Sequence, residues 1–140
     1  MEELREMIIR HEDFRDHVYL DTEGNPTGGY GHHFYPGSRL SREIAERLLD
    51  MDLANTAAEF LKIHPDKTRR LNTARRRVIC DMIFNMGLKR VLEFRRMWTC
   101  VEAEDWNGAA REMMDSVWAN QVKGRAVELA KIMREGKCSS

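Results

Sequence analysis

The sequence has few of the residues that mark several whole classes of protein. Its 140 residues include only three cysteines, Cys80, Cys100 and Cys138. Their odd number and unpaired spacing argue against a disulfide framework or a zinc knuckle. No stretch approaches the ~18 uncharged apolar residues of a membrane span, and the first residues lack a basic-then-apolar secretion signal. We therefore expect synthesis in the cytoplasm, no stable membrane insertion and no unaided export.

The chain also lacks the high net charge and low hydrophobicity of disordered proteins. It is 42% hydrophobic, has a formal net charge of zero and contains three Trp and nine Met. This length fits one domain with one main core, which two lobes can share. The charges are uneven, with 8 Lys/Arg against 14 Asp/Glu in residues 1–67 and 15 against 9 in residues 68–140. Two lobes charged in this way would attract each other.

Apolar spacing predicts a first helix followed by a small hairpin. The stripe that predicts a helix ending at Glu12 recurs at i, i+3, i+4 and i+7 and comprises Leu4, Met7, Ile8 and His11. Residues 18–20 read as a strand, residues 22–26 as a turn, and glycines mark an irregular second arm. Glycine within a strand indicates the close approach of a ligand or of another backbone, and here we favour a ligand.

The remainder of the chain is predicted to be helical. Ser41 is expected to cap a long helix that runs to Leu61 and is ended by Pro65. A second apolar helix is expected to begin at Asn72 or Thr73 and to close at Gly87. Its predicted buried side consists of Val78, Ile79, Met82, Ile83 and Met86. Shorter helices are expected near 94–101, from Asp105-Trp106, around Trp118, and over 123–135, the last stopped by Gly136.

Two carboxylates and a threonine surround the hairpin turn. Glu12 ends the first helix, Asp21 opens the turn nine residues later, and Thr27 leaves it after six more. Hydrolysis of a glycosidic bond needs one protonated carboxyl group and one ionised carboxylate. We expect Glu12 to be desolvated at the end of an apolar helix that faces the second lobe, and Asp21 to stay ionised on a polar turn. The arrangement is suited to acid/base hydrolysis.

Three other interpretations compete with acid/base hydrolysis: ordinary structural roles for the site residues, a metal site and a nucleic-acid-binding surface. Taken singly, Glu12, Asp21 and Thr27 are an ordinary helix-end acid, a turn-capping residue and a strand residue. His11, Glu12 and His17 lack the H-E-x-x-H spacing that puts two imidazoles on one helix face, so no metal is expected. The arginine runs 69–70 and 75–77 alternate with apolar residues and read as the solvated side of a helix, so no nucleic acid is expected as a partner.

The sequence around the turn resembles the catalytic segment of the phage-type lysozymes, the T-even phage muramidases of glycoside hydrolase family 24. The resemblance rests on Glu12, Tyr19-Leu20-Asp21-Thr22-Glu23-Gly24, Pro26-Thr27 and Gly29-Tyr30-Gly31-His32. It continues in Ala74-Arg75-Arg76, Phe84-Asn85-Met86-Gly87, Trp106-Asn107-Gly108-Ala109-Ala110, Trp118-Ala119-Asn120-Gln121 and Arg125-Ala126. The stretch near residues 33–70 is shortened. Gly28 stands where the family usually has isoleucine, and Val122-Lys123-Gly124 precedes Arg125 as a second departure.

The resemblance implies an α+β, mainly helical fold in a single lysozyme-like domain, residues 1–140, with two lobes. A small antiparallel hairpin lobe would span about 13–67, and a helical lobe about 68–136 together with the first helix. A cleft between the lobes would hold bacterial peptidoglycan. Base rates for tryptophan place Trp98, Trp106 and Trp118 in or at the edge of the core, with the floor of a sugar subsite as an alternative for one of them. The implied enzyme is a muramidase that hydrolyses the β-1,4 bond between N-acetylmuramic acid and N-acetylglucosamine.

The same resemblance assigns roles to individual residues. Glu12 would be the general acid, and Asp21 and Thr27 would hold the attacking water, so that the anomeric centre is inverted. Arg125 would reach across the cleft and pair with Glu12. Supporting or substrate-binding roles fall to Gly31, His32 and Asn85, with His32 bracing the hairpin from beneath.

The implied biological setting is that of a phage or prophage endolysin. We expect a monomer without cofactor or metal, which stays in the host cytoplasm until a holin-type release gives it access to the cell wall in the periplasm. The alternative is a non-catalytic lysozyme-like module that binds peptidoglycan or serves as a scaffold, since folds can outlast their activity. The complete set of Glu12, Asp21 and Thr27 argues against this alternative, and Gly28 and the shortened middle argue for it.

Overall fold

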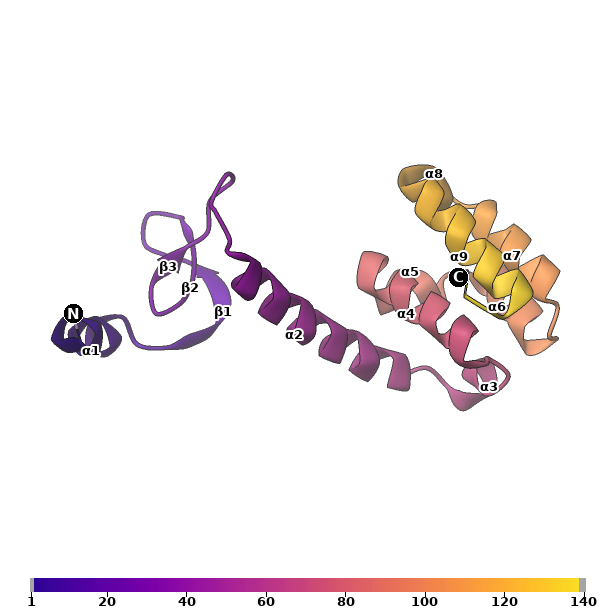
Figure 1. Ribbon diagram of the computed structural model, residues 1–140, viewed down its shortest axis with the longest axis horizontal. Helices are drawn as coiled ribbons and strands as arrows, with labels where there is room; N and C mark the ends of the chain where they lie inside the picture. Colours follow the sequence, from indigo (N-terminus) through magenta and orange to yellow (C-terminus); the bar gives the residue numbers. More distant parts are fainter. Residues whose placement is uncertain (1, 139–140) are drawn as a thin grey trace. The chain divides into compact units, whose positions relative to one another are not determined.

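The computed structural model describes residues 2–138, in which nine helices and a three-stranded antiparallel sheet are found (Figure 1). The strands are β1 (Arg15–Leu20), β2 (Pro26–Gly29) and β3 (His32–His33). The helices are α1 (Glu2–Glu12), α2 (Arg42–Leu61), α3 (Pro65–Thr68), α4 (Thr73–Met86), α5 (Leu88–Leu92), α6 (Arg95–Glu102), α7 (Trp106–Met114), α8 (Val117–Val122) and α9 (Gly124–Glu135). The predicted α+β, mainly helical class is confirmed.

The chain forms two compact units that divide between Ala45 and Glu46, within α2. Unit 1 contains α1, the sheet and the start of α2, and unit 2 contains the remaining helices. The sequence placed the border between its lobes at residues 67 and 68 and grouped the first helix with the helical lobe. That grouping depends on how the two units associate and stays a prediction.

Unit 1 is built around the predicted hairpin and one additional short strand. The strand order is β1-β2-β3, with Tyr19 paired to Thr27 and, on the other side, Thr27 paired to His33. The pairing of β1 with β2 shifts between Arg15 and Tyr19, as expected where glycines interrupt the second arm. Thr27 therefore lies in the middle strand and is flanked on both sides.

Helix α1 ends where the sequence predicted, and its end has a defined geometry. Asp13 follows Glu12 with a positive φ of 59°, and its N–H donates to the carbonyl of Ile9 at 3.0 Å. A left-handed residue at this position ends a helix, and aspartate tolerates it better than most residues do. The chain turns there, so that Glu12 lies at the junction of helix and sheet.

The caps predicted for the longer helices are confirmed. Ser41 Oγ accepts from the Ile44 N–H at 3.2 Å at the start of α2, and Asn72 Oδ1 accepts from the Arg75 N–H at 3.0 Å at the start of α4. Gly87 ends α4 with φ of 86°. The cap of α9 is as predicted, a left-handed glycine, Gly136.

Unit 2 holds the main core, in which α7 packs on α6 and α9, and α4 packs on α5 and α9 (Figure 1). The predicted buried side of α4 is correct, although Met86 is only partly buried. The largest fully buried side chains are Trp98, Ile79, Met82, Met97, Met113, Met133, Val78, Val91 and Val101. Methionine fills irregular gaps between helices, which explains its frequency here.

Two local expectations need correction, and the short helices α3 and α5 were not predicted. Pro65 does not end α2, which stops at Leu61; it begins the short helix α3, where its missing N–H has no cost. Helix α5 was not predicted, because five residues carry too little periodicity. Arg75 does not face solvent: its Nε donates to the Met133 carbonyl at 2.7 Å, and its guanidinium lies 3.9 Å from the centre of the Trp106 ring.

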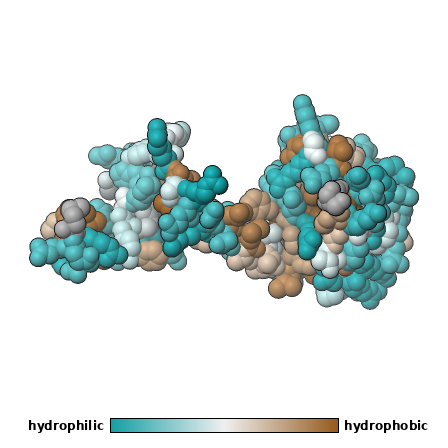
Figure 2. Space-filling view, in the orientation of Figure 1, coloured by the Kyte–Doolittle hydropathy of each residue, from teal (hydrophilic) through white to brown (hydrophobic). Residues whose placement is uncertain are grey.

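The surface of α2 is unusually apolar. Its exposed side chains include Ile44, Leu48, Leu49, Met51 and Leu53. Figure 2 shows brown, apolar atoms gathered over this segment. Within residues 2–138, no helix combines the length and the apolar character needed to cross a bilayer.

Candidate active site

The hairpin turn holds Asp21 by its own backbone. Oδ1 of Asp21 accepts from the N–H groups of Asn25 at 2.8 Å and Glu23 at 2.9 Å. The second oxygen, Oδ2, has longer contacts, 3.4 Å to the Asn25 side-chain amide and 3.4 Å to His33 Nε2. The N–H of Asn25, more than any other group, holds the pKa of Asp21 below its ordinary value, while partial desolvation opposes the shift. Asp21 is thus an ionised carboxylate with one oxygen saturated and one available.

Thr27 lies in the middle strand with a defined hydroxyl orientation. Its side chain is only 2% exposed, and Oγ1 donates to the Asn25 carbonyl at 2.8 Å. Because the hydroxyl proton is used in that bond, the lone pairs of Oγ1 remain to accept a hydrogen. Asn25 therefore connects the two predicted water-holding residues, since its backbone bonds both Asp21 and Thr27.

Glu12 contacts the hairpin at Gly31. A methyl group placed on Gly31 would lie 2.8 Å from both Cδ and Oε2 of Glu12, closer than real contacts allow. Gly31 also has φ of 76°, a conformation that residues with a Cβ rarely adopt. The carboxyl group of Glu12 therefore packs directly against the backbone of Gly31, which has no side chain to keep it away. Glu12 is exposed in this structure, and its predicted desolvation by the second lobe stays a prediction.

The two adjacent histidines of β3 serve opposite faces of the sheet. The ring of His32 packs edge-on against Phe34, with ring centres 4.8 Å apart. His33 approaches Asp21 through Nε2 and the Tyr35 hydroxyl through Nδ1 at 2.5 Å. The supporting role predicted for His32 stays a prediction. His33 was not predicted as a site residue, because its place opposite Thr27 depends on the pairing of β2 with β3, which the sequence alone does not give.

Gly28, the departure noted in the sequence, fits a crowded position. It is buried, and an added methyl group would lie 3.2 Å from the His17 carbonyl oxygen and 3.4 Å from the Phe34 ring. A larger residue here would have to push a neighbouring strand or Phe34 aside. The glycine is thus matched to its surroundings in this chain.

The other two predicted site residues belong to unit 2. Arg125 at the start of α9 bonds Asp81 of α4 through Nε, with Nε to Oδ1 at 2.6 Å. Asn85 Oδ1 accepts from the indole N–H of Trp118 at 2.8 Å. The predicted pairing of Arg125 with Glu12 lies between the units and stays a prediction. Asp81 was not predicted as the partner of Arg125, because no sequence motif distinguishes this aspartate from other polar residues of the helix.

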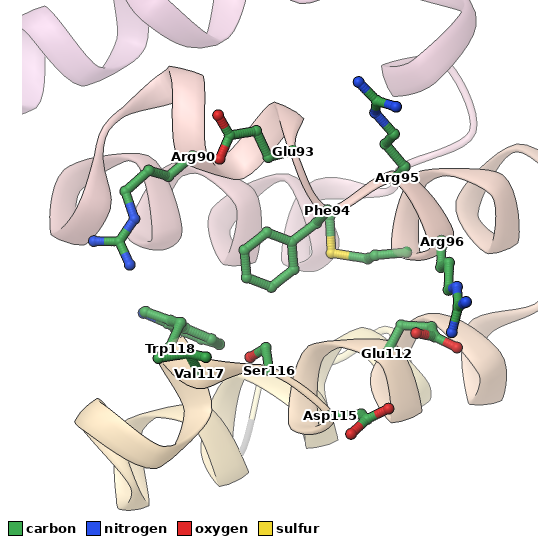
Figure 3. A pocket seen from close by; sticks show the side chains of 11 residues that line it. Arg90, Glu93, Phe94, Arg95, Arg96, Glu112, Asp115, Ser116, Val117 and Trp118 are labelled. Atoms are coloured by element: carbon green, nitrogen blue, oxygen red, sulfur yellow. The ribbon is translucent and has the colours of Figure 1, made fainter.

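A pocket of about 420 Å³ opens in unit 2 between the turn after α5 and the turn after α7 (Figure 3). Phe94 and Trp118 form its apolar part, with their rings edge to face and centres 6.1 Å apart. Acidic and basic side chains line its rim in equal number: Arg90, Arg95, Arg96, Glu93, Glu112 and Asp115. The rim of the pocket thus carries charges of both signs.

The tryptophans are better explained as packing residues than as sugar platforms. Trp98 and Trp118 are 1% and 2% exposed, and Arg75 lies over the ring of Trp106. A sugar stacks on a broad open ring face, which these positions do not offer. Among residues 2–138, no group of three or more His, Cys, Asp and Glu is arranged to hold a metal ion.

A mainly helical chain has the elements of a lysozyme when a helix-end glutamate contacts a glycine of the small sheet and the same sheet carries a turn-bound aspartate and a buried threonine. The comparison with protein families agrees, because the family described as phage lysozyme matches residues 9–135. The chain belongs to the phage lysozyme family, and its function is lysozyme-like.

Individual relatives are distant. The chain is 32% identical to the pre-baseplate central spike protein Gp5 of Enterobacteria phage T4, over 98% of this chain but only 28% of the length of that protein. It is 25% identical to the probable T4-type lysozyme 1 of Dictyostelium discoideum, over 95% of this chain and 94% of the relative. The alignment with the spike protein has 165 positions against 140 residues here, so at least 25 positions are gaps in this chain.

Proposed function

We propose that this protein is a muramidase that hydrolyses the β-1,4 bond between N-acetylmuramic acid and N-acetylglucosamine in bacterial peptidoglycan. The proposal rests on family membership and on one observation: the turn that binds Oδ1 of Asp21 leaves Oδ2 available and also orients the Thr27 hydroxyl. Two carboxyl groups with different surroundings are what glycoside hydrolysis requires.

Asp21 and Thr27 would hold one water molecule between them. The water donates one hydrogen to Oδ2 of Asp21 and the other to Oγ1 of Thr27, whose own proton is bonded to the Asn25 carbonyl. A lone pair of the water then remains free to attack the anomeric carbon, and Asp21 takes up its proton as general base. Attack by water, and not by the carboxylate, gives an inverted product.

Glu12 would protonate the oxygen of the departing sugar. The contact of Glu12 with Gly31 fixes its carboxyl group relative to the same hairpin that carries Asp21 and Thr27. Arg125 is the proposed cationic partner of Glu12. The Arg125 side chain is 38% exposed beside Asp81, so an edge of the guanidinium remains open to a second acceptor.

The test is a turbidity assay on chloroform-treated Gram-negative cells, followed by mass spectrometry of the released fragments. A muramidase leaves N-acetylmuramic acid at the new reducing ends. The matched control is Glu12→Gln, which keeps the shape of the side chain but cannot donate a proton. We expect its rate to fall by at least ~10²-fold with folding unchanged. Clearing at the parent rate, or N-acetylglucosamine at the reducing ends, contradicts the proposal.

We further propose an endolysin role, in which the protein accumulates in the host cytoplasm and reaches the wall in the periplasm after holin-type release, acting as a monomer. The match to a central spike protein favours a second candidate, a lysozyme-like module that works as part of a larger assembly, with or without catalysis. Purified protein that lyses permeabilised cells and elutes as a monomer supports the first. Protein that binds peptidoglycan sacculi without releasing fragments supports the non-catalytic module.

A further inference from the structure

His33 occupies a position that the proposed mechanism has not used. It pairs with Thr27 across β2 and β3, and cross-strand partners point to the same face of a sheet. Its Nε2 lies 3.4 Å from Oδ2 of Asp21, the oxygen that the turn leaves available. His33 therefore adjoins both residues that would hold the water.

Tyr35 fixes the imidazole of His33 from the other side. Tyr35 follows β3 by two residues, and its hydroxyl lies 2.5 Å from His33 Nδ1 with the two rings perpendicular. Tyr35 is itself tied into a turn, since its N–H donates to Ser38 Oγ and its carbonyl accepts from the Ser38 N–H, both at 3.0 Å. The ring of His33 is thus oriented by contacts on both of its nitrogens.

The partners of the two ring nitrogens of His33 indicate which nitrogen carries the proton when the ring is neutral. A phenol donates most readily to an unprotonated ring nitrogen, so Nδ1 accepts from Tyr35. The ring proton then lies on Nε2, which faces the Asp21 carboxylate. The Tyr35 hydroxyl, the His33 ring and the Asp21 carboxylate thus lie in sequence, with a hydrogen bond at Nδ1 and an ion-pair distance of 3.4 Å at Nε2.

We propose that His33, oriented by Tyr35, is a positioning residue that directs Oδ2 of Asp21 toward the attacking water. The proposal rests on the proposed hydrolytic function. His33 Nε2 and the Asn25 side-chain amide, each 3.4 Å from Oδ2, flank this oxygen and limit the direction from which it can accept a hydrogen bond from water. The positive form of His33 also favours the ionised form of Asp21; it lowers the pKa of Asp21 less than the Asn25 N–H, the Glu23 N–H and the Asn25 side-chain amide do.

The contact is tested first by NMR, independently of activity. Full-length protein labelled with ¹³C at aspartate carboxyl groups is titrated, and the Asp21 resonance is followed in the parent, His33→Ala, His33→Gln and Tyr35→Phe. The pKa of Asp21 should rise when His33 is removed. The control is His17→Ala, because His17 is exposed on β1 and pairs with Asp16. An Asp21 titration unchanged by His33→Ala overturns the inference, whether or not the protein is an enzyme.

Kinetic measurements distinguish a positioning role of His33 from a role in packing alone. In an active enzyme, His33→Ala should lower kcat about fivefold, the scale of one modest hydrogen bond, and leave KM nearly unchanged. Tyr35→Phe should produce a smaller loss of the same kind, and His33→Gln, whose amide reaches about as far as Nε2, should restore part of kcat. A shift in KM alone, or an unchanged kcat in all three variants, overturns the positioning role. Tyr35→Phe removes only a hydroxyl group, so it keeps the test decisive if His33→Ala unfolds the hairpin.

Discussion

The backbone of Gly31 lies directly against the carboxyl group of Glu12, so closely that a methyl group on Gly31 would stand 2.8 Å from Oε2. This contact joins the last residue of α1 to the turn between β2 and β3. It explains why a glycine stands at position 31, which the sequence suggested only in general terms. The group that approaches this backbone is the side chain of Glu12, the proposed general acid, which belongs to the same unit.

Gly31→Ala should therefore lower activity by more than it lowers stability. The methyl group must displace Glu12, and the positive φ adds a strain of about 1–2 kcal/mol. Gly37→Ala is the matched control, since Gly37 has φ of 87° with nothing within 4 Å. Urea unfolding should show similar losses in the two variants, whereas the lysis rate should fall mainly in Gly31→Ala. Equal lysis rates would mean that the Glu12 contact has no role in catalysis.

The stereochemistry of the product tests the water-mediated route. We expect the newly released sugar to carry the inverted anomeric configuration in a proton NMR spectrum taken before mutarotation. Thr27→Ala should lose much of the activity and keep oligosaccharide binding, because it removes one of the two acceptors proposed to hold the water. Retention of configuration would assign Asp21 the role of nucleophile instead.

The turn around Asp21 should weaken as its carboxylate is protonated. The pKa of Asp21 is lower in the folded protein than in the unfolded chain, chiefly because the Asn25 N–H donates to it. Between those two values the unfolded state binds more protons, so this contribution is complete above about pH 4 and is lost as the pH falls through the folded value. Hydrogen-exchange protection of the Asn25 amide should fall in that range. The Phe34 amide, which donates to the Pro26 carbonyl, is the reference, and Asp21→Asn should flatten the dependence.

Arg75 should be a main support of unit 2. Besides its bond to Met133, its Nη2 donates to the Arg134 carbonyl at 3.2 Å, and both carbonyls lie in the last turn of α9, where acceptors lack helical partners. Arg75→Ala should lower the free energy of unfolding by about 1.5–3 kcal/mol, the scale of hydrogen bonds to a charged group. Arg75→Lys should recover little, because lysine lacks the planar fork. The exposed neighbour variant Arg77→Ala should change the urea midpoint only slightly.

The sequence by itself determined the local structure and the identity of the predicted catalytic residues. Periodicity and caps gave α1, α2, α4 and α9 because these features act over a few residues. The spacing of Glu12, Asp21 and Thr27 indicated the chemistry, because a tight turn limits where its side chains can lie.

Tertiary structure decided what depends on residues far apart in the chain or on exact backbone position. Arg75 and Met133 meet only once α4 packs on α9, so a helix pattern alone placed Arg75 in solvent. His33 rather than His32 faces Asp21 because strand register assigns side chains to faces, and a shift of one residue would exchange them. The sequence contained both histidines, but the pairing of Thr27 with His33 determined which of them reaches the predicted active site.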